Sequence, residues 1–318
     1  MKKIISYLYK INIINSSKYN DEIVYYDDNN NYYLYKEYTN NIKWIMYLYN
    51  SISYLNNYSF FAYNFKKNIY GDIVSIYNDK RFILIDIGTD FKKTIDIDDM
   101  LLFYRVSSKL LSNNIKYSNN WHILWEDKID YLINHFNNNK LNNKNLSIIF
   151  YYYISIAENV LLYIIKISKN NNLFSNKVCF THRRVIATKF DFYNPLNFII
   201  DTEIRDIGEY IKRLFYINED YENELHYYLK INKLNKYEAS ILYARIVYPS
   251  IFFDDYERNN VDYKKYIDFD KYKDFIKKIY DVITSYIYID KIDWLYWYVY
   301  YAFYFWNFIF NHRFYSVV

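Results

Sequence analysis

The chain has 318 residues, 52% of them hydrophobic, which is enough to bury the core of one large domain or two coupled domains. Its 40 lysines and arginines against 36 acidic residues leave a formal charge of +4, too small and too dispersed to indicate a nucleic-acid partner. The single cysteine, Cys179, cannot form an internal disulfide, and the first residues lack the pattern of a cleaved secretory signal. We therefore expect synthesis in a reducing cytoplasm.

Amino-acid usage is strongly skewed, with 45 tyrosines and 23 phenylalanines but only 3 glycines and 2 prolines. Residues with AT-rich codons are abundant, and the tyrosines show no repeat or period. The base composition of an AT-rich genome therefore explains the tyrosine excess. Glycines that persist against this bias carry information, and Gly71 and Gly88 predict turns.

The first ninety residues predict a small α+β lobe. Strand-like runs separated by asparagine and aspartate clusters indicate antiparallel hairpins. These runs cover residues 22–28, 31–38, 60–67, 72–78 and 81–88. Apolar residues on one face predict a helix over residues 42–55 that packs on this sheet.

After residue 90 the pattern changes to helices. The helical segments cover residues 98–111, 121–136, 146–167, 238–258 and 272–288, and an asparagine-rich loop is expected at 137–145. Residues 294–310 carry no charge, and a run of this length is at the lower limit of the roughly 17–25 residues of a bilayer span. Their tyrosine, tryptophan and phenylalanine content favours a buried helix, with a membrane or partner surface as the alternative.

The strongest functional pattern lies in residues 178–215. A short apolar strand over 198–200 ends in Asp201, where open sheets present ligand groups. Asp206 precedes a helix that is amphipathic from Ile207 onward, so we expect Asp206 to be its N-cap. Two carboxylates around one turn suit a metal-and-phosphate site, although a turn former and an ordinary cap give the same pattern.

Five segments occur together in one order, at residues 151–164, 179–184, 195–215, 242–253 and 292–295. The most specific motif is DxxxRDxxEYI, formed by Asp201, Arg205, Asp206, Glu209, Tyr210 and Ile211. Together they resemble the spore coat protein YutH family, which is related to the CotS kinases. The resemblance implies a two-lobed, protein-kinase-like (aminoglycoside phosphotransferase-like) α+β fold. Residues 1–90 would form the small antiparallel-sheet lobe and residues 91–318 the large helical lobe.

The resemblance also implies roles for individual residues, since phosphoryl transfer needs a strand lysine, a catalytic base and ligands for magnesium. Lys36 is the candidate strand lysine for binding a nucleotide cofactor, although a solvated lysine at a strand end is an equal alternative. Asp201 corresponds to the metal-binding aspartate. Asp206 corresponds to the aspartate that supports the catalytic loop.

The catalytic loop departs from active members of this fold. They carry His-Gly-Asp followed five positions later by Asn, whereas this chain has His182, Arg183 and Arg184, with Lys189 at the asparagine position. Arginine cannot accept a proton at physiological pH, and lysine cannot bind a metal cation as an amide does. No glycine precedes Gly71, so the first hairpins lack backbone that can approach phosphates closely. We expect a degenerate catalytic site, with Mg-ATP binding left open.

Two further residues are assigned from their local pattern. Glu158, on an apolar helix, is expected to pair with Arg205 or Arg245, with a cap on a helix kink as the alternative. Cys179 follows an apolar run and is interpreted as a small buried residue rather than a nucleophile.

The resemblance, together with the degenerate loop, implies a structural or assembly protein of the bacterial endospore coat, which we expect to be made in the cytoplasm and then bound to other coat proteins. In this interpretation Arg183, Arg184 and Asp201 form an ion network in place of a magnesium site. The alternative is an active ATP-dependent phosphotransferase of a small molecule or coat protein, with Asp191 as a displaced base. No integral membrane span is expected, and peripheral membrane association through residues 294–310 is a third hypothesis.

Overall fold

A computed structural model describes residues 1–20, 22–39, 41–59, 61–111, 121–138, 144–169, 178–183 and 188–292. Arg184, most of the predicted loop at 137–145 and the aromatic segment 294–310 lie outside these residues. The chain divides into two compact units, Met1–Ile115 with Lys177–Glu203, and Lys116–Asn176 with Ile204–Val318. This division by contacts does not test the predicted lobe boundary at residue 90, which stays a prediction.

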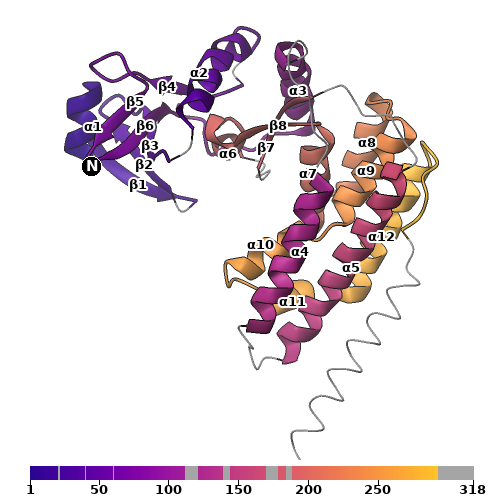
Figure 1. Cartoon of the computed structure of the whole chain (residues 1–318). Coiled ribbons are helices and arrows are strands. Elements are labelled where there is room, and N and C mark those ends of the chain that lie inside the picture. The colour runs from indigo at the N-terminus through magenta and orange to yellow at the C-terminus, as the bar shows by residue number, and fades with distance from the viewer. Residues whose placement is uncertain are drawn as a thin grey trace, which may run out of the picture. The chain divides into compact units, whose positions relative to one another are not determined.

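The first unit contains an antiparallel sheet with the order β1-β2-β3-β6-β4, and β5 also pairs with β6 (Figure 1). The predicted strands and the predicted helix are confirmed. Its elements are α1 (Lys2–Tyr9), β1 (Ile13–Tyr19), β2 (Glu22–Asp27), β3 (Tyr32–Glu37), α2 (Ile42–Asn56), β4 (Asn64–Lys66), β5 (Val74–Tyr77) and β6 (Lys80–Asp86). Sequence reasoning missed α1 and β1.

Helix α1 covers one face of this sheet. Its residues Ile5, Leu8 and Tyr9 form one buried cluster with Tyr25, Tyr33, Tyr35, Phe82 and Leu84 from the strands. Because successive strand residues point to opposite faces, Tyr33 and Tyr35 contact this cluster while Leu34 between them faces the other side. The tyrosine-rich strands therefore supply apolar ring surface to a core, whatever the origin of the tyrosine excess.

A second, two-stranded antiparallel sheet packs on α3 (Ile97–Leu111) in the same unit. Strand β7 (Cys179–His182) pairs with β8 (Phe198–Asp201), and between them lie the short helix α6 (Lys189–Phe192) and a 3₁₀ turn at Pro195–Asn197. The backbone amide of Phe180 donates to Ser107 Oγ of α3 at 3.2 Å. This hairpin therefore belongs by contact to the first unit.

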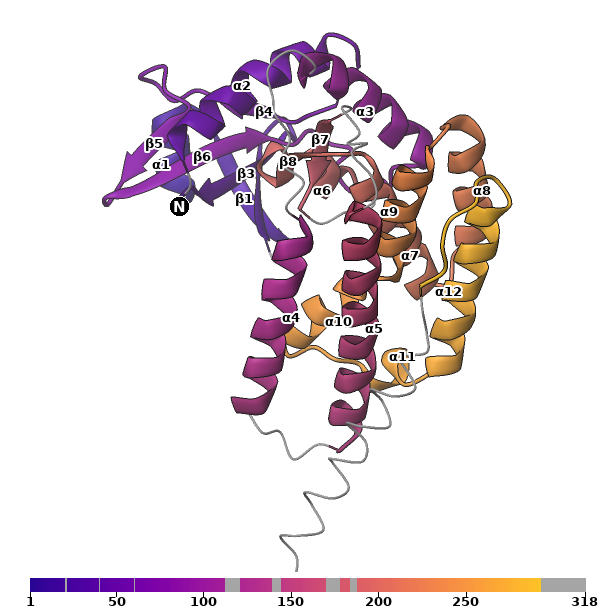
Figure 2. The ribbon, with the colours of Figure 1, turned by 45° about the vertical axis from the view of Figure 1, so that its right-hand side comes forward.

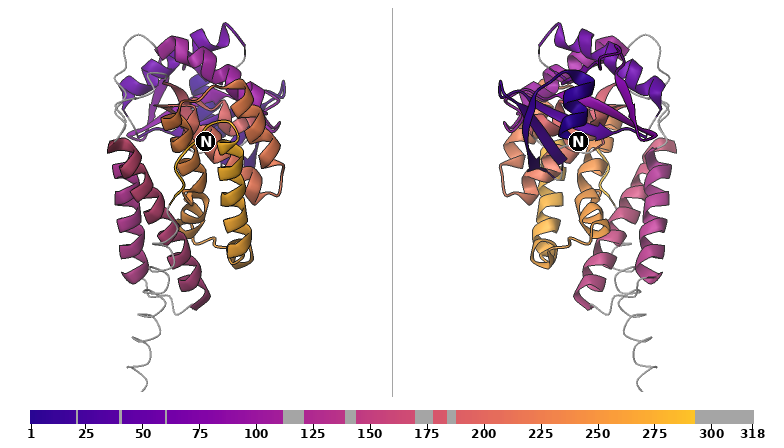
Figure 3. Two further views of the ribbon diagram at one scale, coloured as in Figure 1. Left: turned by 90° about the vertical axis from the view of Figure 1, so that its right-hand side faces the viewer. Right: turned by 90° about the vertical axis from the view of Figure 1, so that its left-hand side faces the viewer.

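The second unit is helical in the part that the structure describes. Figures 2 and 3 show α4 lying alongside α5, while α12 packs against α8 and α9. The helices are α4 (Trp121–Asn138), α5 (Lys144–Lys169), α7 (Ile204–Tyr216), α8 (Tyr221–Ile231), α9 (Lys236–Val247), α10 (Ser250–Glu257), α11 (Tyr263–Tyr266) and α12 (Phe269–Thr284). The segment predicted at 238–258 is two helices, because Pro249 has no amide hydrogen to continue the first.

Within α5, residues Asn145–Ser168 are long and apolar enough to cross a membrane by length and composition, and 67% of that window is buried in the structure. Buried core helices meet the same criterion. Phe150 stacks on Phe136 of α4 with ring centroids 4.2 Å apart, and Tyr152 stacks on Phe269 of α12 at 4.1 Å. These contacts make α5 the central helix of a protein core.

Gly208 is required by a close contact between two helices. It lies where α7 meets α9, and a Cβ atom there would lie 3.0 Å from the Cβ of Arg245. The two backbones can approach only because residue 208 has no side chain.

We expect Gly208→Leu to lower the free energy of unfolding by about 1–3 kcal/mol or more, because the added atoms overpack this contact. Urea unfolding followed by circular dichroism measures the change. Lys230→Leu, at an exposed position of α8, is the control and should stay within about 0.5 kcal/mol. Equal effects of the two substitutions would contradict the close helix contact.

Candidate functional site

Asp201 ends strand β8, as predicted, but its side chain is only 4% exposed. Its Oδ1 accepts a hydrogen bond from the Thr202 amide at 2.7 Å. Across the hairpin it pairs with Cys179, whose Sγ lies 3.7 Å from the Asp201 carbonyl oxygen. One carboxylate oxygen is thus already used by the backbone, and Cys179 is buried as expected.

His182 is a structural residue. It is 1% exposed, and its Nε2 donates to the Phe192 carbonyl oxygen at 2.7 Å. Its ring stacks on Phe192 and also contacts Phe103 and Phe198. These contacts hold the end of β7 in place and leave the imidazole no access to a substrate.

Arg183 directly follows this buried histidine and is exposed. Its backbone amide donates to the Asn197 carbonyl oxygen at 3.1 Å. Burial raises the pKa of Tyr38, and the positive charge of Arg183 partly offsets this rise. The ion network predicted for Arg183, Arg184 and Asp201 stays a prediction.

The tip of the first hairpin touches the segment that follows the degenerate loop. Tyr19 pairs with Glu22, so β1 and β2 are joined by the two residues 20 and 21. Asn20 has a positive φ of 46°, and its Nδ2 lies 3.3 Å from Asp191 Oδ2. Thr188 Oγ1 donates to the same oxygen at 3.0 Å. The candidate displaced base is therefore held by two neutral donors.

Four aromatic rings fill the space beside this contact; we call Tyr19, Tyr32, Phe91 and Phe190 the ring cluster. Tyr19 meets Phe91 and Phe190 edge to face, with centroids 5.2 and 5.0 Å apart. Tyr32 lies 5.1 Å from Phe91, and both phenylalanines are 2% exposed. Sequence reasoning missed the ring cluster because its members come from separate elements and share no period.

Backbone hydrogen bonds join the same two segments. The amides of Lys189 and Phe190 donate to the carbonyl oxygens of Lys93 and Phe91, each at 2.8 Å. Thr94 and Thr188 form an isolated antiparallel bridge. The chain that follows β6 is thus paired with α6, and these polar groups are used within the protein.

Lys36 lies on β3 as predicted, where it forms an ion pair with Glu22 of the neighbouring strand. In active protein kinases the corresponding lysine pairs with a glutamate on the helix of the small lobe. Helix α2, with the sequence IKWIMYLYNSISYLN, contains no acidic residue. The arrangement around Lys36 therefore differs from that of an active kinase.

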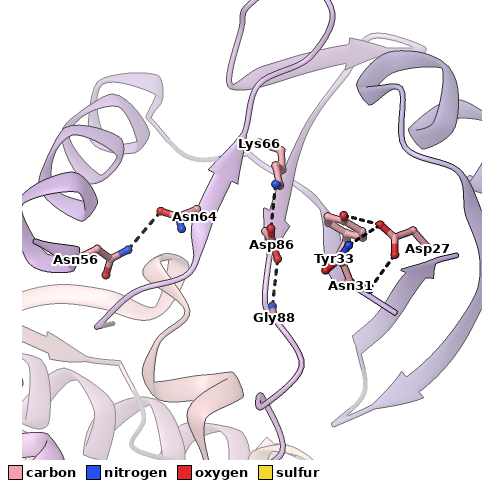
Figure 4. A network of polar contacts seen from close by, with 8 residues as sticks. All are labelled: Asp27, Asn31, Tyr33, Asn56, Asn64, Lys66, Asp86 and Gly88. Carbon is pink, nitrogen blue, oxygen red and sulfur yellow. Dashed lines mark hydrogen bonds and ion pairs between the residues drawn. The ribbon is translucent and has the colours of Figure 1, made fainter. Parts of the chain in front are cut away.

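Other polar groups of the sheet are also engaged internally (Figure 4). Lys66 Nζ lies 2.9 Å from Asp86 Oδ2, and the Gly88 amide donates to Asp86 Oδ1. Asp27 is buried, which raises its pKa, but hydrogen bonds from Asn31, Asn29 and Tyr33 outweigh burial and leave its pKa below the ordinary value. These contacts stabilise the turns at the ends of the strands.

The remaining motif residues belong to the second unit. Helix α7 begins at Ile204, so Asp206 lies in its first turn and the N-cap prediction is wrong. The polar pair Arg205 and Asp206 concealed the first apolar residue of the helix, Ile204. Asp206 is 0% exposed, and the predicted pairing of Glu158 with Arg205 or Arg245 stays untested.

A buried polar network extends from the same motif. Lys212 is 0% exposed, and its Nζ lies 3.0 Å from Glu209 Oε1 and 2.6 Å from Ser250 Oγ. Ser250 Oγ in turn donates to Glu209 Oε2 at 2.7 Å. Because Ser250 is the first residue of α10, the network joins α7 to α10.

The donor set of the first unit fits magnesium poorly. Mg²⁺ prefers an octahedral set of oxygens, but Asp201 is buried and Lys189 stands at the position expected for a second ligand. Within the described ranges, no group of three histidine, cysteine, aspartate or glutamate side chains is arranged to hold a metal ion. The predicted metal role of Asp201 stays a prediction.

Comparison with solved structures identifies the fold. An aminoglycoside phosphotransferase from Alicyclobacillus acidocaldarius subsp. acidocaldarius DSM 446 has a TM-score of 0.56 at 10% identity, covering 90% of this chain and 95% of that chain. Spectinomycin phosphotransferase APH(9)-Ia, in complex with ADP and spectinomycin, has a TM-score of 0.55 at 11% identity, with 89% and 96% covered. The predicted kinase-like fold, with a sheet-containing N-terminal lobe and a helical C-terminal lobe, is confirmed.

Comparison with protein families identifies the group. No curated protein matches the chain. A family model described as "Spore coat putative kinase YutH" matches residues 2–301, which is nearly the whole sequence. The chain therefore belongs to the spore coat putative kinase YutH family.

Proposed function

We propose that this protein is a catalytically degenerate kinase-like component of the bacterial spore coat, with a structural or assembly role. It would be made in the cytoplasm and then bind other coat proteins. Membership of a spore coat family supports the location.

The direct contact between Asn20 and Asp191 carries the proposal of degeneracy. In protein kinases a glycine-rich loop between the first strands covers the phosphates of ATP. Here the chain between β1 and β2 contains no glycine, and the Asn20 side chain that follows β1 lies 3.3 Å from Asp191. No phosphate group fits between two atoms at hydrogen-bond distance.

The chemistry of the catalytic loop points the same way. The base position holds a permanently charged arginine, which accepts no proton, and the second metal-ligand position holds Lys189. The ring cluster and the backbone bonds of Phe91 and Lys93 fill the adjoining space from within. The surfaces left for partners would then lie outside this site.

Thermal unfolding with and without Mg·ATP tests the proposal. A ligand at a hundred times its dissociation constant stabilises by about 2.7 kcal/mol, which is a readable rise in Tm. We expect no rise for the wild type or for Asp201→Asn, because the hairpin tip and the ring cluster exclude nucleotide. An active aminoglycoside phosphotransferase in the same buffer is the positive control.

A rise in Tm that is lost in Asp201→Asn would contradict the proposal that the catalytic site is degenerate. It would support the alternative, an ATP-dependent phosphotransferase. Asp191→Asn would then test the displaced base, since turnover should fall while the Tm shift remains. Failure of a fluorescent fusion to accumulate on developing spores would separately contradict the coat role.

A further inference from the structure

A cavity in the second unit lies apart from every residue discussed as a catalytic or nucleotide-binding candidate. Its volume is about 400 Å³, within the range of about 300–1,000 Å³ typical of small-molecule pockets. It lies where α5, the end of α7, α11 and the start of α12 meet; Figure 2 shows α11 near the ends of α5 and α12. It is lined by Tyr153, Phe215, Tyr216, Tyr272, Lys264 and Lys271, among others.

The floor of the cavity is aromatic. Phe215 and Tyr272 are buried, and their rings lie 5.8 Å apart and edge to face. Tyr216 stacks at 6.3 Å from Tyr272, and Tyr153 lies 5.2 Å from the same ring. Such a floor offers aromatic edges and faces against which a further ring can pack.

Ammonium groups occupy the rim. Lys265 is already neutralised by Asp255 at 2.9 Å. Lys271 Nζ donates to a neutral partner, Asn218 Oδ1 at 2.7 Å, and lies 5.5 Å from the centre of the Phe215 ring. Lys264 lines the same cavity, and the structure records no side-chain partner for it among the described residues.

The acidic residues on the rim are used differently. Asp262 Oδ1 accepts a hydrogen bond from the backbone amide of Lys264 at 3.0 Å. Asp268 Oδ1 accepts one from the backbone amide of Lys271, also at 3.0 Å. They are the N-caps of α11 and α12, so part of their acceptor capacity satisfies helix ends. Formal charges around the cavity therefore nearly cancel, and selectivity would come from directed ammonium bonds rather than from a long-range field.

We propose that this cavity binds a small molecule that carries one aromatic ring and one anionic group. The ring would pack against the aromatic floor, and the anion would accept hydrogen bonds from Lys264 and Lys271. All residues that line the cavity belong to the second unit, so binding there does not depend on the proposed function.

Isothermal titration of the full chain with four probes tests this assignment. Phenyl phosphate and benzoate carry both features, phenol carries only the ring, and inorganic phosphate carries only the charge. We expect saturable binding of phenyl phosphate, benzoate or both, at least tenfold tighter than binding of phenol or inorganic phosphate. A charge-assisted hydrogen bond is sufficient for a difference of about tenfold.

Lys264→Gln and Lys271→Gln are each expected to weaken that binding by about tenfold. Lys273→Gln, an exposed position on the same helix that does not line the cavity, is the matched control and should bind as the wild type does. Absence of saturable binding of both complete probes, equal binding of phenol, or unchanged affinity in both lysine variants would overturn the proposal.

Discussion

Replacing Lys212 by methionine is expected to lower the free energy of unfolding by about 3–5 kcal/mol, because it takes the fully buried ammonium group away from the Glu209 carboxylate, whose side chain is only 17% exposed. Lys212 is fully buried against Glu209 and Ser250, and methionine can fill its volume but donates no hydrogen bond. Chemical denaturation followed by circular dichroism measures the loss. A loss of this size is a large fraction of the roughly 5–15 kcal/mol that stabilises a typical domain.

Two comparisons make this result specific. The double variant Lys212→Met with Glu209→Met removes both charges, and we expect it to recover most of the lost stability. Lys278 bridges α12 to Glu222 of α8 at 2.6 Å, but both side chains are substantially exposed. Lys278→Met should therefore cost no more than about 1 kcal/mol. Similar losses for Lys212→Met and Lys278→Met would contradict the buried network.

Alkaline solution is expected to unfold the protein cooperatively above pH 10. Burial raises the pKa of Tyr163 to about 12 and raises the pKa of several other core tyrosines further. These phenols are neutral in the folded state, whereas an unfolded tyrosine ionises near pH 10. Their contribution to stability is complete below pH 10 and is lost as the pH rises toward the folded-state pKa values.

The size of the effect follows from the number of such side chains. Each fully buried tyrosine costs up to about 1.4 kcal/mol of stability per pH unit above 10. Among the described residues, eight tyrosines are at most 5% exposed and have strongly raised pKa values: Tyr33, Tyr63, Tyr153, Tyr163, Tyr193, Tyr243, Tyr266 and Tyr272. One to two pH units should therefore exhaust the stability of an ordinary domain.

Phenolate absorbance at 295 nm and far-ultraviolet circular dichroism, recorded on the same samples, check this expectation. The buried phenols should ionise in one step together with the loss of helix signal. A titration in 6 M guanidinium chloride supplies the unfolded reference, with ionisation near pH 10. Gradual ionisation of all tyrosines near pH 10 with the helix signal intact would contradict the buried positions.

Much of the fold could be predicted because its elements carry strong local patterns. In strands β2, β3 and β6 the apolar residues alternate with polar ones or form short runs between polar turns. Helices α3, α4 and α5 are long, and their apolar residues recur with helical spacing. Strand β1 was missed because it reads IINSSKY, with little alternation and most of its side chains exposed. The apolar periodicity also placed the start of α7 at Ile207, three residues after its observed start at Ile204, because the polar side chains of Arg205 and Asp206 interrupt the pattern.

The candidate site was less accessible to sequence reasoning. The position of Asp201 at a strand end could be inferred because strand and turn are adjacent in the chain. The contact of Asn20 with Asp191 joins residues 171 positions apart, and no local pattern reports such a pair. The partner of Lys36 likewise lies on another strand, since Glu22 faces it only through the antiparallel register of β2 and β3.

The first unit is built from two separate stretches of the chain, so its parts are synthesised at different times. This unit is left near residue 115 and completed only by residues up to 203, when β7 and β8 reach α3. Translation at about 5–20 residues per second takes roughly 4–18 seconds over those intervening residues. During this interval the nascent chain displays the apolar side of α3 without its hairpin. Transient association with a chaperone is therefore expected at that stage, and ribosome profiling of chaperone-bound chains would locate it.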